Sequence, residues 1–179
     1  MSIFIIIVIV VAVAVGIVLL VAAMRPGTLR VERRIRIQAP PTRIAPLIAD
    51  FRRWGAWSPY EKKDPALKRS FSGPANGKGA VYAWDGNKEV GQGRMEILES
   101  SPSKIAIKLD FIKPFEGHNM VEFTLQPQDD ATEVVWAMYG PARCMTKVMS
   151  LFIDFDKMIG KDYEVGLANL KAAVEQSST

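Results

Sequence analysis

Cysteine and histidine are almost absent from this 179-residue chain, which contains one of each, Cys144 and His118. A single cysteine cannot form an intramolecular disulfide, and two residues cannot supply the ligands of an ordinary zinc site. We therefore expect no metal and no cofactor, and we interpret Cys144 as a small buried apolar side chain.

The chain also lacks the short motifs of common catalytic and nucleotide-binding sites. It has no Gly-x-Ser-x-Gly nucleophile elbow, no Walker-type phosphate loop and no His-Glu-x-x-His zinc helix. The glycine pairs 77/79 and 91/93 each open an expected strand rather than a helix, so neither should cradle a pyrophosphate. A lone histidine such as His118 is more typical of a surface position than of a catalyst. We expect no dedicated catalytic residue.

One long hydrophobic run stands out against these absences. Residues 3–23 contain no charged, amide or hydroxyl side chain. As a helix this run would be about 31 Å long, close to the roughly 30 Å hydrocarbon core of a bilayer. A cleaved secretory signal would have a basic N-terminal region and a shorter apolar core, and a buried core helix rarely runs so far without a polar residue. The run predicts a retained, single-pass transmembrane helix over residues 1–24.

Positive charge is concentrated directly after this run. Residues 25–43 carry six of the 23 Lys and Arg residues and one acid, Glu32, for a local net charge of +5; the remaining 17 cations and 18 acids leave residues 44–179 at −1. Cationic segments stay cytoplasmic and attract anionic lipids, so we expect the N-terminus outside, the domain in the cytoplasm (of a bacterial inner membrane, if bacterial) and the bilayer as a partner. A near-neutral domain argues against nucleic acid as a binding partner. The residues expected at the membrane surface are Arg25, Arg30, Arg33 and Arg34.

The remaining length, about 155 residues, suits one domain with a single core. We expect a basic juxtamembrane linker over residues 25–30, a domain over residues 31–176 and a short tail over residues 177–179. Oligomeric state stays open.

The pattern within the domain predicts a strand, a short helix, six strands and a long helix. Period-two alternation after Leu29 predicts a first strand that starts properly near Arg34, because Arg33 interrupts its apolar row. Prolines 40 and 41 open a helix that ends near Ala49, and the aromatic-rich residues 51–60 indicate a packed loop or short helical turns. Turn residues separate six further strands, expected at 68–72, 78–84, 91–99, 104–112, 118–126 and 132–139.

From Met145 onward, apolar residues recur at three- and four-residue intervals. This spacing predicts one long amphipathic helix, with a bend at Gly160. One curved antiparallel sheet needs one apolar cover, which this helix supplies. The expected fold class is therefore α+β, with an additional N-terminal transmembrane helix.

The concave face of the expected sheet is the most promising site. Its aromatic and thioether side chains suit an apolar ligand, although a filled core would show the same pattern. Asn119 shares a face with Val121 and Phe123, and its amide must find a partner, either a ligand or a hydrogen bond at the hairpin end. The residues expected to line a ligand cavity are Tyr82, Trp84, Phe111, Asn119, Phe123, Trp136, Met138, Met149 and Phe152.

Several segments resemble the SRPBCC superfamily, also called START-like or polyketide cyclase/dehydrase. The resemblance covers roughly residues 31–175 and is carried by residues 31–51, Trp54-Gly55-Ala56-Trp57-Ser58-Pro59 and residues 79–87, 91–97, 123–127 and 131–136. It implies a helix-grip fold, in which a seven-stranded antiparallel sheet wraps a C-terminal helix around a deep cavity. Members bind lipids, sterols, hormones, polyketides or quinones. The superfamily has no universal catalytic motif, so the resemblance assigns no catalytic residue here.

These observations favour a membrane-tethered, non-catalytic protein that binds an apolar small molecule or lipid. One alternative is an enzyme acting on an apolar cyclic or polyketide-like substrate, with His118, Asp110, Glu122 or Tyr82 as acid or base; it requires a titratable group inside the cavity. The other is a protein-interaction or stress-response module, which an exposed apolar patch outside the cavity would favour.

Overall fold

The computed structural model describes residues 2–142 and 144–176, so the expected tail and the side chain of Cys144 lie outside the described residues. The helices are α1 (Ile3–Ala23), α2 (Pro41–Ala49), α3 (Cys144–Met149) and α4 (Phe155–Gln176), with short 3-10 helices η1 (Phe51–Ala56) and η2 (Pro59–Lys62). The strands are β1 (Thr28–Ile37), β2 (Lys68–Ser72), β3 (Val81–Asp85), β4 (Gln92–Ser100), β5 (Lys104–Lys113), β6 (Gly117–Gln128) and β7 (Ala131–Pro141).

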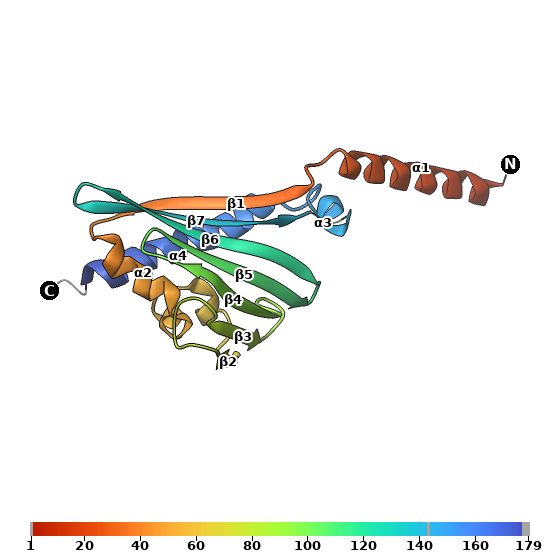
Figure 1. Ribbon diagram of the computed structural model, residues 1–179. Coiled ribbons are helices and arrows are strands. Elements are labelled where there is room, and N and C mark those ends of the chain that lie inside the picture. Colours follow the sequence, from red (N-terminus) through yellow and green to blue (C-terminus); the bar gives the residue numbers. More distant parts are fainter. Residues whose placement is uncertain (1, 143, 177–179) are drawn as a thin grey trace.

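The seven strands form one antiparallel sheet in the order β1-β7-β6-β5-β4-β3-β2. The sheet curves, and α4 lies along its concave side (Figure 1). Alternation decides which side chains face α4: in β6, Val121, Phe123 and Leu125 are buried, whereas the residues between them are half-buried. The predicted α+β class, sheet and C-terminal helix are confirmed.

The first strand is longer than predicted. It begins at Thr28 rather than near Arg34, and it pairs with β7 from Thr28 opposite Pro141 to its end. Arg33 does not end the strand, because its side chain crosses the concave face to carboxylates on α4. Residues 28–30, expected in the linker, therefore belong to the sheet.

The predicted long final helix is two helices. α3 ends at Met149 and α4 begins at Phe155, so the interruption lies at residues 150–154 and α4 continues through Gly160. The Asp154 carboxylate accepts a hydrogen bond from the Lys157 amide at 3.0 Å, which satisfies one of the free N–H groups at the start of α4. Gly160 instead leaves room for Arg33, since a Cβ there would overlap the guanidinium.

α1 projects away from the sheet (Figure 1). It is long and apolar enough to cross a membrane, and its most apolar 18-residue stretch is not buried against the domain. This exposure excludes the alternative of a buried core helix.

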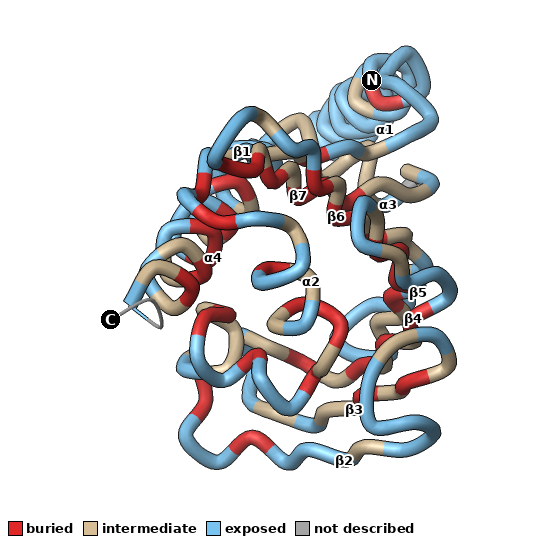
Figure 2. Tube along the Cα trace, turned by 60° about the vertical axis from the view of Figure 1, so that its left-hand side comes forward, coloured by how far each residue is buried: buried red, intermediate tan, exposed pale blue. Residues whose placement is uncertain are grey.

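The aromatic segment 51–60 fills one end of the concave face. Trp54 and Trp57 are buried, with ring centroids 4.8 Å apart, and both rings stand edge-on to Phe123. Figure 2 shows buried residues along the inner side of the sheet and on α4. The space left for a ligand is consequently confined to the other end of the concave face.

Candidate ligand cavity

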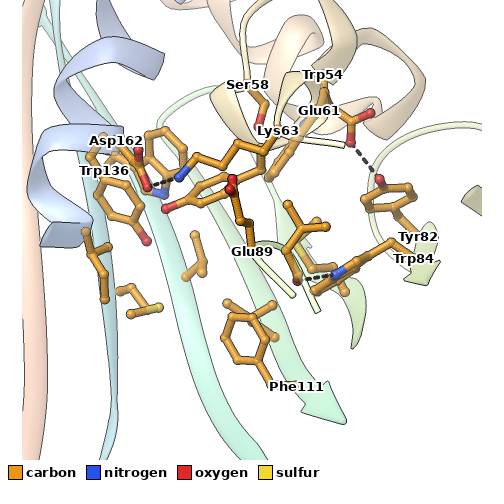
Figure 3. A pocket seen from close by; sticks show the side chains of 18 of the residues that line it. Trp54, Ser58, Glu61, Lys63, Tyr82, Trp84, Glu89, Phe111, Trp136 and Asp162 are labelled. Atoms are coloured by element: carbon orange, nitrogen blue, oxygen red, sulfur yellow. Dashed lines mark hydrogen bonds and ion pairs between the residues drawn. The ribbon is translucent and has the colours of Figure 1, made fainter. Parts of the chain in front are cut away.

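A cavity of about 350 Å³ lies between α4, the η1–η2 segment and the inner face of the sheet (Figure 3). This volume is at the lower end of the range for small-molecule pockets. Its lining consists of Trp54, Ser58, Tyr60, Glu61, Lys63, Leu67, Tyr82, Trp84, Glu89, Val90, Met95, Leu109, Phe111, Val121, Trp136, Met138, Met158, Ile159, Asp162 and Tyr163.

Five of the nine residues expected to line a cavity are in this lining: Tyr82, Trp84, Phe111, Trp136 and Met138. They come from three strands, β3, β5 and β7, whose inward faces converge because the sheet is curved. Tyr82 stacks on Trp84 with centroids 5.8 Å apart, and Trp84 meets Phe111 edge-on at 6.0 Å. These rings form an apolar wall opposite α4.

The other four expected residues lie outside the lining. Phe123 is fully buried, because Trp136 stacks on it at 5.0 Å and the rings of Trp54 and Trp57 cover it edge-on. Asn119 lies against Gly140 of β7, beyond the cavity. Met149 lies in α3 and Phe152 in the turn after it. Both lie outside the space between the sheet and α4, because the last helix is interrupted, and Phe152 is 77% exposed.

Trp136 forms the floor between the cavity and the filled core. Its indole stacks on Tyr163 of α4 with centroids 3.9 Å apart and planes 10° from parallel. A Cβ at Gly166 would come within 2.7 Å of this indole, so glycine permits the close approach of α4. The floor is therefore a stack of Phe123, Trp136 and Tyr163.

Two hydrogen-bonded clusters of polar side chains border this apolar cavity. In the first, the Tyr82 hydroxyl donates to Glu61 Oε1 at 2.6 Å, and Arg69 Nε donates to Glu61 Oε2 at the same distance. Burial and the hydrogen bond to Glu61 raise the pKa of the Tyr82 phenol well above its usual range. This tyrosine is a proton donor, and the Glu61 carboxylate is already paired.

The second polar cluster joins the η2 segment to α4. Lys63 Nζ lies 2.6 Å from Asp162 Oδ2, with about a quarter to a third of each side chain exposed, and 5.0 Å from the centre of the Tyr60 ring. Burial, together with Tyr163 and Asp162, raises the pKa of Tyr60, and burial with Asp162 raises that of Tyr163. Both phenols therefore stay neutral.

Two buried polar atoms in the lining, Ser58 Oγ and Trp136 Nε1, have no hydrogen-bond partner among the described residues. Ser58 is 1% exposed and Trp136 is 2% exposed. An unmade hydrogen bond of a buried hydroxyl is unfavourable. Ser58 could donate to or accept from a polar group of a bound molecule.

Sequence reasoning missed much of the lining, including both polar clusters. The only local signal was the density of aromatic residues in segment 51–60, which supplies Trp54 and Tyr60. Glu61, Lys63 and Asp162 look like ordinary surface charges in the sequence, because nothing local indicates that η2 and α4 meet across the cavity.

Three of the four acid or base candidates lie away from the cavity. His118 Nδ1 is 2.7 Å from Asp110 Oδ1 on the outer side of the sheet, and Glu122 lies 3.4 Å from Lys104. Burial opposes ionisation of Asp110, but hydrogen bonds from His118 and Lys108 outweigh it and lower its pKa. Tyr82 alone of the four faces the cavity. The part of the chain that the structure describes contains no group of three or more His, Cys, Asp or Glu arranged to hold a metal.

The arginines expected at the membrane surface are mostly paired within the domain. Arg33 contacts Asp156 at 3.0 Å and Glu164 at 2.8 Å, Arg30 contacts Glu32 at 2.6 Å, and Arg34 contacts Glu32 at 3.0 Å. Arg33 faces α4 because it is on the inner side of β1. Its role in the fold is structural.

Solved structures with the same fold have low sequence identity to this chain. Protein CV1439 from Chromobacterium violaceum is 18% identical with a TM-score of 0.56, covering 84% of this chain and 99% of its own. The Aha1 dimer from Colwellia psychrerythraea is 18% identical with a TM-score of 0.59, covering 82% and 96%. The di-domain ARO/CYC StfQ from the steffimycin biosynthetic pathway is 11% identical with a TM-score of 0.62, covering 84% of this chain and 52% of its own.

Comparison with curated proteins finds no significant match. The sequence profile of one family, described as polyketide cyclase/dehydrase and lipid transport, matches residues 28–175. This match begins with the first residue of β1 and ends near the end of α4, so it spans the whole sheet and its covering helix. The chain belongs to the polyketide cyclase/dehydrase and lipid transport family.

Proposed function

We propose that this protein is a membrane-tethered, non-catalytic binder of an apolar small molecule or lipid. The observation that carries the proposal is the cavity itself, which is apolar over most of its wall and has a few polar groups at fixed places. α1 would span the membrane, with the N-terminus outside and the domain in the cytoplasm, as the position of the arginines favours.

The charges of the lining narrow the kind of ligand. Lys63 is compensated by Asp162, Glu61 is paired with Arg69, which lies outside the lining, and Glu89 adds a further carboxylate. No uncompensated cation is available among the described lining residues to hold a carboxylate or phosphate. We therefore expect a neutral apolar molecule with one or two hydrogen-bonding groups, which Ser58 could meet.

The test is native mass spectrometry of the full chain extracted from its membrane in detergent. We expect a bound neutral molecule in the wild-type protein and its loss in Val121→Trp, which puts an indole into the cavity. Val165→Trp is the matched control, because residue 165 is exposed on the outer side of α4. An empty wild-type protein that also fails to bind the neutral probe N-phenyl-1-naphthylamine would contradict the proposal.

A second candidate function is acid catalysis on an apolar cyclic substrate. The observation that favours it is the Tyr82–Glu61 hydrogen bond within the cavity, since a phenol beside a carboxylate can transfer a proton. Comparison of the molecules retained by wild-type protein and by Tyr82→Phe distinguishes the two functions. A Tyr82→Phe variant that retains the same unaltered molecule favours binding, whereas accumulation of a different precursor favours catalysis.

A further inference from the structure

Large apolar side chains are exposed at one end of the domain, the end from which α1 leaves. They occur around α3 and where β5 turns into β6, both at that end in Figure 1. Their exposed fractions run from 38% to 77%. The rim patch is defined by Met145, Phe152, Ile153, Ile112 and Phe115.

Few such residues lie elsewhere on the domain. Apart from Met24, which follows α1, and Met158, which lies in the first turns of α4, the other large apolar residues exposed in the described part of the domain are Leu98 and Val165. The turn between β6 and β7, at the opposite end, carries Asp129 and Asp130. Exposed apolar side chains gathered at one end of a domain are typical of an interaction surface.

The chain holds this end of the domain close to α1. Residues 24–27 join α1 to β1 and can span at most about 14 Å. Thr28 pairs with Pro141, and the Ala142 amide donates to the Gly27 carbonyl at 2.8 Å. α3 follows directly and packs against α1. The α3 part of the rim patch is therefore fixed beside the end of α1 by the sheet.

From this placement we infer that the rim patch lies in the interfacial region of the same bilayer that α1 crosses. The inference rests on the proposed function, in which α1 is a membrane anchor. Apolar side chains inserted at the boundary between headgroups and acyl chains bind a bilayer without spanning it. Because Arg30, Arg33 and Arg34 are paired within the domain, the rim patch rather than these arginines sets how the domain lies on the surface.

The rim patch continues into the cavity wall. Residues 150–154 lead from α3 into α4, whose first turns carry Met158 and Ile159. Both line the cavity, and Met158 is 54% exposed. With the rim patch in the bilayer, an apolar ligand passes between the acyl-chain region and the cavity without exposing its surface to water.

The test places a fluorescent label in the rim patch of the full chain. In a Cys144→Ser background, which removes the single cysteine, Phe152→Cys and Phe115→Cys are labelled with a nitrobenzoxadiazole dye and reconstituted into phosphatidylcholine–phosphatidylglycerol vesicles containing a doxyl-labelled lipid. Asp130→Cys at the opposite end is the matched control. Phe152 and Phe115 are exposed, so their replacement should leave the fold intact.

We expect several-fold stronger quenching at positions 152 and 115 than at position 130. Equal, weak quenching at all three positions in protein that floats with the vesicles would overturn the inference and leave the anchor in place. Dye emission at position 152 that the doxyl lipid does not quench but that changes when protein concentration is raised would assign the patch to a protein partner, and would also overturn the inference. Protein that does not float with the vesicles would contradict the anchor itself.

Discussion

Gly166 of α4 lies against the indole of Trp136, so closely that a Cβ at position 166 would be 2.7 Å from Cζ3 of that ring and 3.0 Å from Cδ of Pro59. The indole cannot withdraw, because Phe123 and Tyr163 stack on it from two directions. The position of α4 over the cavity floor depends on this glycine.

Gly166→Ala should therefore destabilise the domain. Alanine favours helix by up to about 1 kcal/mol over glycine, but overpacking against a fixed ring typically costs about 1–3 kcal/mol. We expect a net loss, measured as a lower midpoint of chemical unfolding of the full chain in detergent. Gly55→Ala is the control, because a Cβ at that position would meet nothing within 4 Å. An equal loss in both variants would contradict the role of Trp136.

Tyrosine ionisation should coincide with unfolding at alkaline pH. Burial raises the pKa of Tyr60, Tyr82 and Tyr163 in the folded domain, whereas an unfolded tyrosine ionises near about 10. Because these phenols are neutral in the folded domain, their contribution to the free energy of unfolding is complete below pH about 10. It is lost as the pH rises above that value, where the unfolded tyrosines ionise. Tyrosinate absorbance should increase together with the loss of circular dichroism. An increase in the tyrosinate absorbance of these three residues before the loss of circular dichroism would contradict the prediction.

The contacts of Arg33 should weaken in acid. The hydrogen bond from Arg33 lowers the pKa of Asp156, so the stability from this pair is present above the unfolded pKa of about 3.9 and is lost as the pH falls below it. Asp156→Asn should lower the melting temperature at neutral pH, and its difference from wild type should shrink in acid. Asp85→Asn, which removes an exposed carboxylate at the end of β3, should show no such dependence.

Replacing both Lys63 and Asp162 with apolar residues should be tolerated, whereas replacing Lys63 alone should destabilise the domain. Lys63→Met leaves the Asp162 carboxylate beside the cavity without its cation, which we expect to cost about 1–2 kcal/mol, between the values for exposed and buried pairs. The double variant Lys63→Met/Asp162→Leu should recover most of that loss and bind N-phenyl-1-naphthylamine more tightly. Additive losses in the double variant would show that the two side chains act independently.

His118 should be dispensable for the proposed binding. Its ring is half exposed and contacts Asp110 on the outer side of the sheet, away from the cavity. His118→Ala should retain the same co-purified molecule as wild type by native mass spectrometry. Loss of the molecule in a folded His118→Ala protein would move the site to the outer face.

Local patterns in the sequence were sufficient for the architecture. Turn residues located the last six strands within a few residues, because glycine, proline, asparagine and aspartate favour the backbone angles at which strands end. The apolar run identified α1. The predicted extents of the first strand and of the last helix were wrong for the same physical reason, because contacts between distant segments override the local pattern. Arg33 forms ion pairs with Asp156 and Glu164 of α4, and α3 packs against α1 instead of continuing into α4.

The sequence by itself determined the sheet, its covering helix, an apolar concave face and an apolar N-terminal helix, since these follow from periodicity and composition. Only the tertiary structure decided where the cavity lies. Trp54 and Trp57 fill one end of the concave face and bury Phe123, while Glu61, Lys63 and Asp162 bring polar groups to the other end. These residues come from segments far apart in the chain, and whether they fill a space or line one depends on how the segments pack.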